Sequence, residues 1–98
     1  MELNIIFPNT EFIQINKEDL QKGMKYITKR NQNQSIFIFM DECKYIGNTF
    51  TFFRTKAFIL SQNNNQNNFK YETKIINEEI TLDSSYFNRV EMYKYGKD

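Results

Sequence analysis

The run Ile36–Met40 constrains this chain more than any other stretch, because it places apolar residues in succession without a polar break. A β-strand sends alternate side chains to opposite faces of a sheet, so a strand of this composition has no face for solvent. The run is short for a helix and rich in β-branched and aromatic residues. We therefore predict that it forms the central strand of a sheet covered on both faces.

Alternating apolar and polar residues, or short apolar runs, predict further strands. These strands are expected at Leu3–Phe7, Phe12–Ile15, Thr49–Phe52, Ala57–Leu60, Phe69–Ile76 and Ile80–Leu82. Turn-forming residues are expected to end or join strands at Asp41–Glu42, Gly47–Asn48, Asn77–Glu79 and Asp83–Ser85. We expect the first two strands to form a hairpin across residues 8–10. Near Phe53 the alternation breaks, which indicates a bulge or a turn.

Two further segments have a less regular pattern. Residues 62–68 form an Asn/Gln-rich stretch with no apolar side chain to bury, which predicts a mobile loop between two strands of a long hairpin. Tyr86–Tyr95 fits either a strand or a helix capped by Ser84. Its aromatic residues and Val90 favour the strand.

One helix is predicted between Asn16 and Arg30. Asn16 is a suitable N-cap, and Asp19 completes a weak capping box. An apolar stripe at helical spacing follows, formed by Leu20, Met24 and Ile27. The fold class that these elements predict is α+β, with one helix packed on a twisted or partly rolled antiparallel sheet of about six strands.

A single helix cannot cover both faces of such a sheet. The sequence therefore predicts that the sheet curls on itself or that another chain covers it. We expect a single domain over residues 1–98, because that length suffices for one hydrophobic core.

Charge and cysteine content narrow the functional classes. The formal net charge of +1 produces no overall field that would attract nucleic acid or membrane. Cys43 is the only cysteine, which excludes an internal disulfide and favours a reducing compartment. The sequence has no apolar stretch of about 20 residues and no signal peptide pattern, so we expect a cytoplasmic protein without a membrane partner.

Three motifs resemble parts of catalytic sites. Ile36–Glu42 fits the apolar strand and acidic end of a Walker B motif, but no glycine-rich phosphate loop accompanies it. A Glu-x-Lys pattern found in metal-dependent nucleases occurs at Glu42–Lys44 and at Glu72–Lys74. This pattern arises by chance in charged chains, and a nuclease site also needs a further carboxylate that binds the same metal ion. Cys43 has no histidine to act as its base, because the chain contains none. We predict no enzyme activity, no cofactor and no metal site.

Two basic surfaces are the candidate binding sites. The predicted helix would present Lys22, Lys25, Tyr26, Lys29 and Arg30 on or near one face. The simpler interpretation of this face is solvated charge that complements the helix dipole. A second surface would combine basic and aromatic side chains across the long hairpin, although Glu72 interrupts it. Its members are Arg54, Lys56, Lys70, Tyr71 and Lys74.

The segment Val90–Tyr95 is predicted to form an exposed sheet edge, with Tyr93 and Tyr95 as binding residues. Our leading hypothesis is a non-catalytic protein-binding module that self-associates or binds another protein. It could be an inhibitor or accessory factor of a phage, plasmid or other mobile element. The alternative is a small nucleic-acid-binding domain that uses the basic helix face or the basic-aromatic hairpin.

Overall fold

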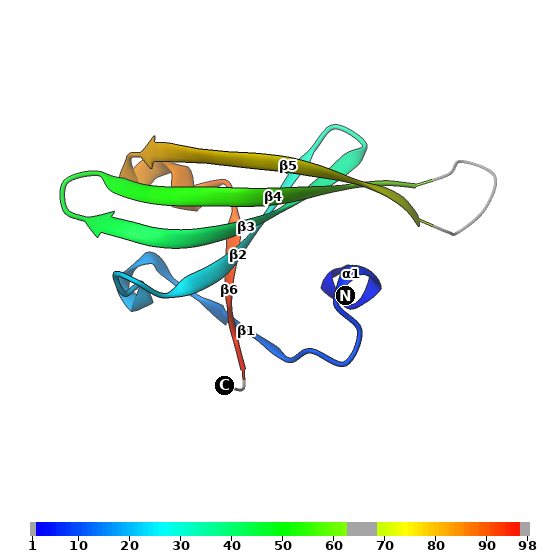
Figure 1. Cartoon of the computed structure of the whole chain (residues 1–98), viewed down its shortest axis with the longest axis horizontal. Coiled ribbons are helices and arrows are strands. Elements are labelled where there is room, and N and C mark those ends of the chain that lie inside the picture. Colours follow the sequence, from blue (N-terminus) through cyan, green and yellow to red (C-terminus); the bar gives the residue numbers. More distant parts are fainter. Residues whose placement is uncertain (1, 63–68, 97–98) are drawn as a thin grey trace.

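The computed structural model describes residues 2–62 and 69–96, and it contains a six-stranded antiparallel sheet in the order β1-β6-β2-β3-β4-β5 (Figure 1). The elements in chain order are α1 (Leu3–Ile6), β1 (Phe12–Ile15), the 3₁₀ helix η1 (Lys17–Asp19), β2 (Lys25–Gln32), β3 (Ser35–Ile46), β4 (Phe50–Gln62), β5 (Phe69–Leu82), the 3₁₀ helix η2 (Ser84–Asn88) and β6 (Glu91–Tyr95). The sheet is not closed, because β1 and β5 form its two edges. The predicted antiparallel sheet of six strands is confirmed.

The predicted central strand is confirmed as the middle of β3, which pairs with β2 and β4. Ile38 and Phe39 point to opposite faces, and both are buried, with 0% and 6% of their surface exposed. The prediction that Asp41–Glu42 ends this strand is wrong. The strand continues to Ile46, because the buried Asp41 side chain is paired with Arg54 on β4.

The helix predicted between Asn16 and Arg30 is wrong. Its capping box is present, since the carboxylate of Asp19 accepts a hydrogen bond from the backbone N–H of Asn16 at 3.0 Å, but it starts only η1. Gly23 then takes a positive φ of 89°, which a helix does not contain. The chain continues as β2, whose residues 26–29 are all buried. A helix would have exposed part of that segment.

The first predicted strand, Leu3–Phe7, is also wrong, because this segment forms the single helical turn α1. A strand would divide its apolar side chains between two faces. The helical turn instead directs Leu3, Ile6 and Phe7 to one side, at i, i+3 and i+4, where they pack against the sheet. Leu3 is fully buried there. The predicted hairpin with Phe12–Ile15 does not form, and β1 pairs with β6 instead.

Different short segments cover the two faces of the sheet. One face, which we call the α1 face, packs against α1 and includes Ile27, Ile38, Phe58, Leu60 and Tyr93. The other, the η2 face, packs against Phe87 of η2 and includes Ile15, Tyr26, Cys43, Phe52 and Met92. The two-sided burial expected from Ile36–Met40 is therefore achieved within one chain, without closure into a barrel.

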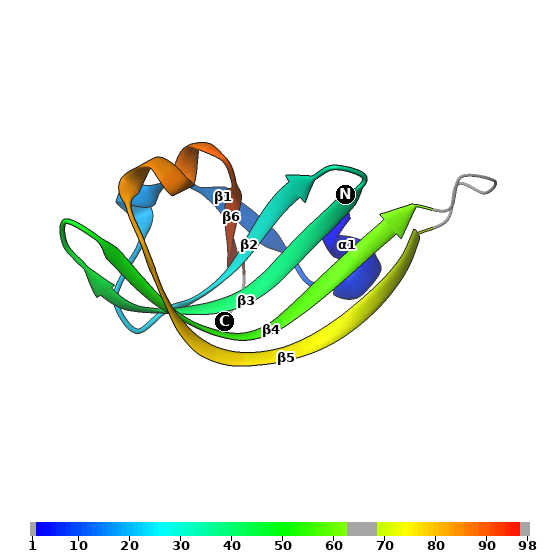
Figure 2. The same cartoon turned by 90° about the horizontal axis from the view of Figure 1, so that it is seen from above.

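The long strands β3, β4 and β5 curve strongly along their length (Figure 2), and the pairing among them is irregular. The register between β3 and β4 shifts at Thr55, which has no partner on β3, and this confirms a bulge after Phe53. The register between β4 and β5 shifts at the same level. Asn77 has a positive φ of 53° there, and β5 continues through it. The turn predicted at Asn77–Glu79 is therefore wrong.

The hairpin predicted around the Asn/Gln-rich stretch is confirmed, because β4 and β5 pair up to Gln62 and Phe69. The mobility predicted for residues 62–68 concerns positions 63–68, which lie outside the described residues. The ambiguous segment Tyr86–Tyr95 contains both structures, the end of η2 and then β6. Because β6 lies between β1 and β2, the prediction that Val90–Tyr95 forms an edge is wrong.

Candidate functional site

A buried ion pair lies on the η2 face at the middle of the sheet. The guanidinium of Arg54 donates to both carboxylate oxygens of Asp41, at 2.9 and 3.0 Å. Thr28 donates to the same carboxylate at 2.9 Å, and Arg54 donates to the hydroxyl of Tyr86 at 3.4 Å. Asp41 and Arg54 are only 4% and 7% exposed. This network joins β2, β3, β4 and η2, so its role is structural.

Electrostatics keep Arg54 charged. Burial opposes the charged form, but hydrogen bonds and charge attraction from Asp41 outweigh it, and the pKa of the guanidinium is raised. The ring of Phe39 also lies 3.6 Å from the guanidinium carbon. Arg54 was predicted to be part of a basic-aromatic binding surface. Its donors are used inside the protein, so it is not available as a surface cation.

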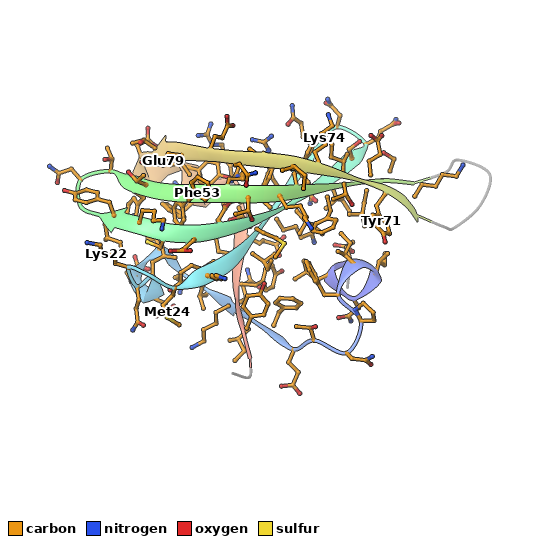
Figure 3. All side chains as sticks on the ribbon, viewed as in Figure 1. Lys22, Met24, Phe53, Tyr71, Lys74 and Glu79 are labelled. Carbon is orange, nitrogen blue, oxygen red and sulfur yellow. The ribbon has the colours of Figure 1, made fainter. Side chains whose placement is uncertain are left out.

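The other residues of that predicted surface lie on β4 and β5 and are divided between the two faces of the sheet. Lys74 and Tyr71 extend to opposite sides of the strand (Figure 3). Lys70 shares the side of Lys74, and Lys56 shares the side of Tyr71 through its register with Ile75. The structure therefore leaves Lys56 and Tyr71 on one face and Lys70 and Lys74 on the other, and does not bring the predicted residues together as one surface.

The predicted basic helix face is likewise divided, because the segment is a turn followed by a strand. Lys22 and Lys25 are exposed, whereas Lys29 is only 9% exposed. Lys29 forms ion pairs with Glu2 and, at 3.9 Å, with Glu91. The ion pair with Lys29 lowers the pKa of the Glu2 carboxyl. This lysine therefore stabilises the N-terminal segment on the α1 face.

Tyr93, which was predicted to contact a partner, is 5% exposed and belongs to the core of the α1 face. Its hydroxyl donates to the carboxylate of Glu91 at 2.5 Å. Burial and this contact with Glu91 raise the pKa of Tyr93. The structure therefore places Tyr93 beneath the surface, where it supports β6.

Three of the predicted binding residues do meet, in an open groove beside β1 and the turn before β2. Lys25, Tyr26 and Tyr95 line this groove, together with Ile13, Asp19, Gln21, Gly23, Met24, Lys94 and Gly96. The groove has a volume of about 550 Å³. We call it the β1 groove. The figure with all side chains shows Met24 and Lys22 at this end of the molecule (Figure 3).

Two apolar side chains of the β1 groove are exposed, Ile13 by 48% and Met24 by 49%. Tyr26 forms part of its wall, and its hydroxyl accepts a hydrogen bond from the backbone N–H of Gln21 at 2.8 Å. Burial raises the pKa of Tyr26. The sequence interpretation missed Ile13 and Met24, because both fit the apolar periodicity of a buried face.

A second pocket, of about 370 Å³, lies on the η2 side and is lined by Arg30, Asn31, Gln32, Tyr86 and Arg89. We call it the arginine pocket. No carboxylate lines it within the described residues. The Nε of Arg30 is buried and has no hydrogen-bond partner there, while its guanidinium lies between 5 and 6 Å from two phenylalanine rings. Such a pocket can bind an anion.

The position of Cys43 does not favour a role as a nucleophile. Cys43 is fully buried, and burial raises the pKa of its thiol, which disfavours the reactive thiolate.

Over residues 2–62 and 69–96, no group of three His, Cys, Asp or Glu side chains could hold a metal ion. The same residues contain no helix long and apolar enough to cross a membrane.

Comparison of the chain with known proteins gave no match to a protein family, to a curated protein or to a solved structure.

Proposed function

We propose that this protein is a small non-catalytic binding module for another protein, and that the β1 groove is its binding site. The observation that carries the proposal is the pair Ile13 and Met24, which expose about half of their surface and line the same groove. Exposed apolar side chains gathered in a concave site are typical of protein-binding surfaces.

The charges of the β1 groove define the partner. Lys25 and Lys94 contribute two cations to its lining, whereas Asp19 contributes one carboxylate, which is already bonded to the backbone of Asn16. An acidic segment with an apolar side chain would place that side chain between Ile13 and Met24. Its carboxylates would pair with the two lysines.

The biological role that we propose is that of an inhibitor or accessory factor in the cytoplasm, of the kind that phages, plasmids and other mobile elements encode. Small size, the absence of histidine and a groove rather than a catalytic cleft support this role. Such a factor acts by covering a site on its partner, which requires no chemistry of its own.

The proposal is tested by quantitative capture from cell extract with two charge-matched variants. Lys25→Glu with Lys94→Glu reverses the groove charges. Lys17→Glu with Lys22→Glu changes the net charge equally on nearby exposed lysines that do not line the groove. A partner should be captured by the wild type and by the second variant and lost by the first.

A captured protein is then purified and its affinity measured by calorimetry. We expect Met24→Ser to weaken binding by about tenfold, because it removes an apolar side chain that the bound partner would cover. Equal affinity of the wild type, the Met24→Ser variant and the groove charge variant would exclude the β1 groove as the binding site.

The second candidate function is the binding of a single-stranded nucleic acid, which the arginine pocket favours. Arg30 and Arg89 could contact phosphate, and the half-buried Phe37 beside Arg30 offers a ring on which a base could stack. Fluorescence anisotropy with a labelled oligonucleotide at several salt concentrations tests it. Binding that weakens steeply with salt, and that Arg30→Gln with Arg89→Gln reduces, would support this function.

A further inference from the structure

The outer edge of β5 is the longest open edge of the sheet. This strand runs from Phe69 to Leu82 and pairs only with β4, whereas the other edge, β1, has four residues. Within the described residues, no strand or helix pairs with the outer edge of β5 (Figure 1). An open edge presents backbone N–H and C=O groups to which another strand can add.

The side chains of β5 are unusually exposed for a long strand. Tyr71 and Ile75 expose 51% and 67% of their surface on the α1 face. Thr73 lies between them on the same face. Glu72 and Lys74 are exposed on the opposite face. The strand therefore carries an apolar pair on one face and a pair of opposite charges on the other.

We infer that two copies of this chain associate through antiparallel pairing of β5 with β5, on a twofold axis that passes by Thr73. In this register Thr73 lies opposite its own copy. Tyr71 lies opposite Ile75 of the second copy, and Glu72 lies opposite Lys74. Symmetry produces each of these pairs twice. An aromatic side chain opposite a β-branched one and opposite charges are both favourable cross-strand pairs.

The neighbouring registers are less favourable. A twofold axis at Glu72 places that carboxylate against itself and Lys70 against Lys74. An axis at Lys74 places two ammonium groups together. Like charges directly opposite one another are destabilising. Among these three registers, the one centred on Thr73 alone pairs opposite charges and avoids like charges.

The backbone limits the pairing to the same window. Asn77, with its positive φ of 53°, interrupts the regular strand after Ile76. The regular part of β5, from Phe69 to Ile76, contains the whole ladder from Lys70 to Ile76 that pairing about Thr73 requires. The backbone is therefore compatible with the register that the side-chain pattern favours.

The partner that pairs with the open edge of β5 is a second copy of this chain, because the residue pattern of β5 is complementary to itself. The β5 edge and the β1 groove lie at opposite edges of the sheet order. The dimer therefore leaves the groove open, and it does not depend on the proposed function. It joins two six-stranded sheets into one continuous sheet, with both α1 faces on the same side.

Sedimentation equilibrium from low to high micromolar concentration tests this association. Glu72→Lys and Lys74→Glu each place like charges opposite one another twice, and we expect each to weaken the dimer by about tenfold or more. The double exchange, Glu72→Lys with Lys74→Glu, restores opposite charges and should recover the wild-type association. A monomeric wild type at the highest concentration would overturn the inference, as would a dimer that the single exchanges do not weaken or the double exchange does not recover.

The register is tested by mild oxidation of Thr73→Cys. Residues directly opposite in an antiparallel ladder have Cα atoms about 4.5–5.5 Å apart, within the range that a disulfide spans. We expect a covalent dimer on a non-reducing gel. Lys70→Cys is the matched control, because its copy lies at the far end of the ladder, and the wild type controls for the buried Cys43. Equal cross-linking of the two variants would overturn the register.

Discussion

The strands β3 and β5 are both long and both contain apolar and charged residues, but they occupy opposite environments. β3 has a paired strand on each side and segments packed on both faces. β5 has one paired neighbour and exposes most of its side chains. A charge in the first strand, Asp41, is buried in a hydrogen-bonded network. The charges of the second are solvated.

This difference shows where stability and binding reside. The inner strand satisfies its polar groups within the chain, so a substitution there affects folding. The outer strand leaves its side chains and backbone edge unused, so a substitution there affects association. The predictions that follow test this division.

The largest effect is expected for Asp41→Ala. It leaves the guanidinium of Arg54 buried without its partner, and breaking a buried ion pair in this way costs about 3–5 kcal/mol. Urea denaturation measures the loss. The double variant Asp41→Leu with Arg54→Met should regain most of it, because no unpaired charge remains. A loss below about 1 kcal/mol for the single variant would show that water reaches the network.

The next largest contrast is between Phe39 and Phe37, two residues apart on the same face of β3. Phe39 is 6% exposed and packs under Arg54, so Phe39→Ala should cost about 3–5 kcal/mol. Phe37 is only half-buried, and its truncation should cost about 1–2 kcal/mol. Equal losses in thermal unfolding would show that an uncharacterised contact covers Phe37.

A smaller effect is expected at alkaline pH. Burial raises the pKa of Tyr26, Tyr93 and Tyr95 above the usual value of 10.0, and Glu91 adds to the shift at Tyr93. The folded state therefore holds these protons after the unfolded state has lost them. Their stabilising contribution is complete below about pH 10 and is lost as the pH rises further.

Urea midpoints measured from pH 8 to pH 11 check this dependence. The variant Tyr93→Phe, which has no phenolic proton, should lose stability less steeply above pH 10 than the wild type does. An identical slope for the two proteins would show that Tyr93 does not contribute.

The smallest effect on folding is expected on β5. Ile75→Ser and Tyr71→Ser replace exposed side chains, so the stability of the monomer should change by no more than about 0.5 kcal/mol. Dilute protein is required, because dimer formation stabilises the folded state at higher concentration. A large loss in dilute solution would place β5 in the core and would remove the contrast with β3.

The local parts of the fold could be predicted from the sequence. The continuous apolar run identified the centre of β3, and the broken alternation after Phe53 identified a bulge. The segment from Asn16 to Arg30 misled, because its capping box and apolar spacing also fit a helix. The strand is favoured over the helix only because residues 26–29 are buried on both faces of the sheet. The segments that bury them are distant in sequence, so the local pattern does not indicate this burial.

Long-range pairing also determined which candidate residues meet. Lys25 and Tyr26 were selected from the predicted helix and Tyr95 from the predicted edge strand, and the pairing of β6 with β2 brings them to one groove. Lys29 was assigned to a surface, but its partners Glu2 and Glu91 come from the two ends of the chain. No local pattern indicates such contacts.

The position of β6 has a consequence for the order of folding. β1 and β2 are neighbours in sequence, yet they must remain apart until β6, the last strand of the chain, is placed between them. The strands β2 to β5 form hairpins with short loop closures and can assemble first, whereas β6 closes a much longer loop. Until it does so, β2 has an unpaired inner edge. This topology predicts that, before β6 is placed, the interior strand β2 rather than the outer strand β5 is the site most exposed to unwanted pairing with other chains.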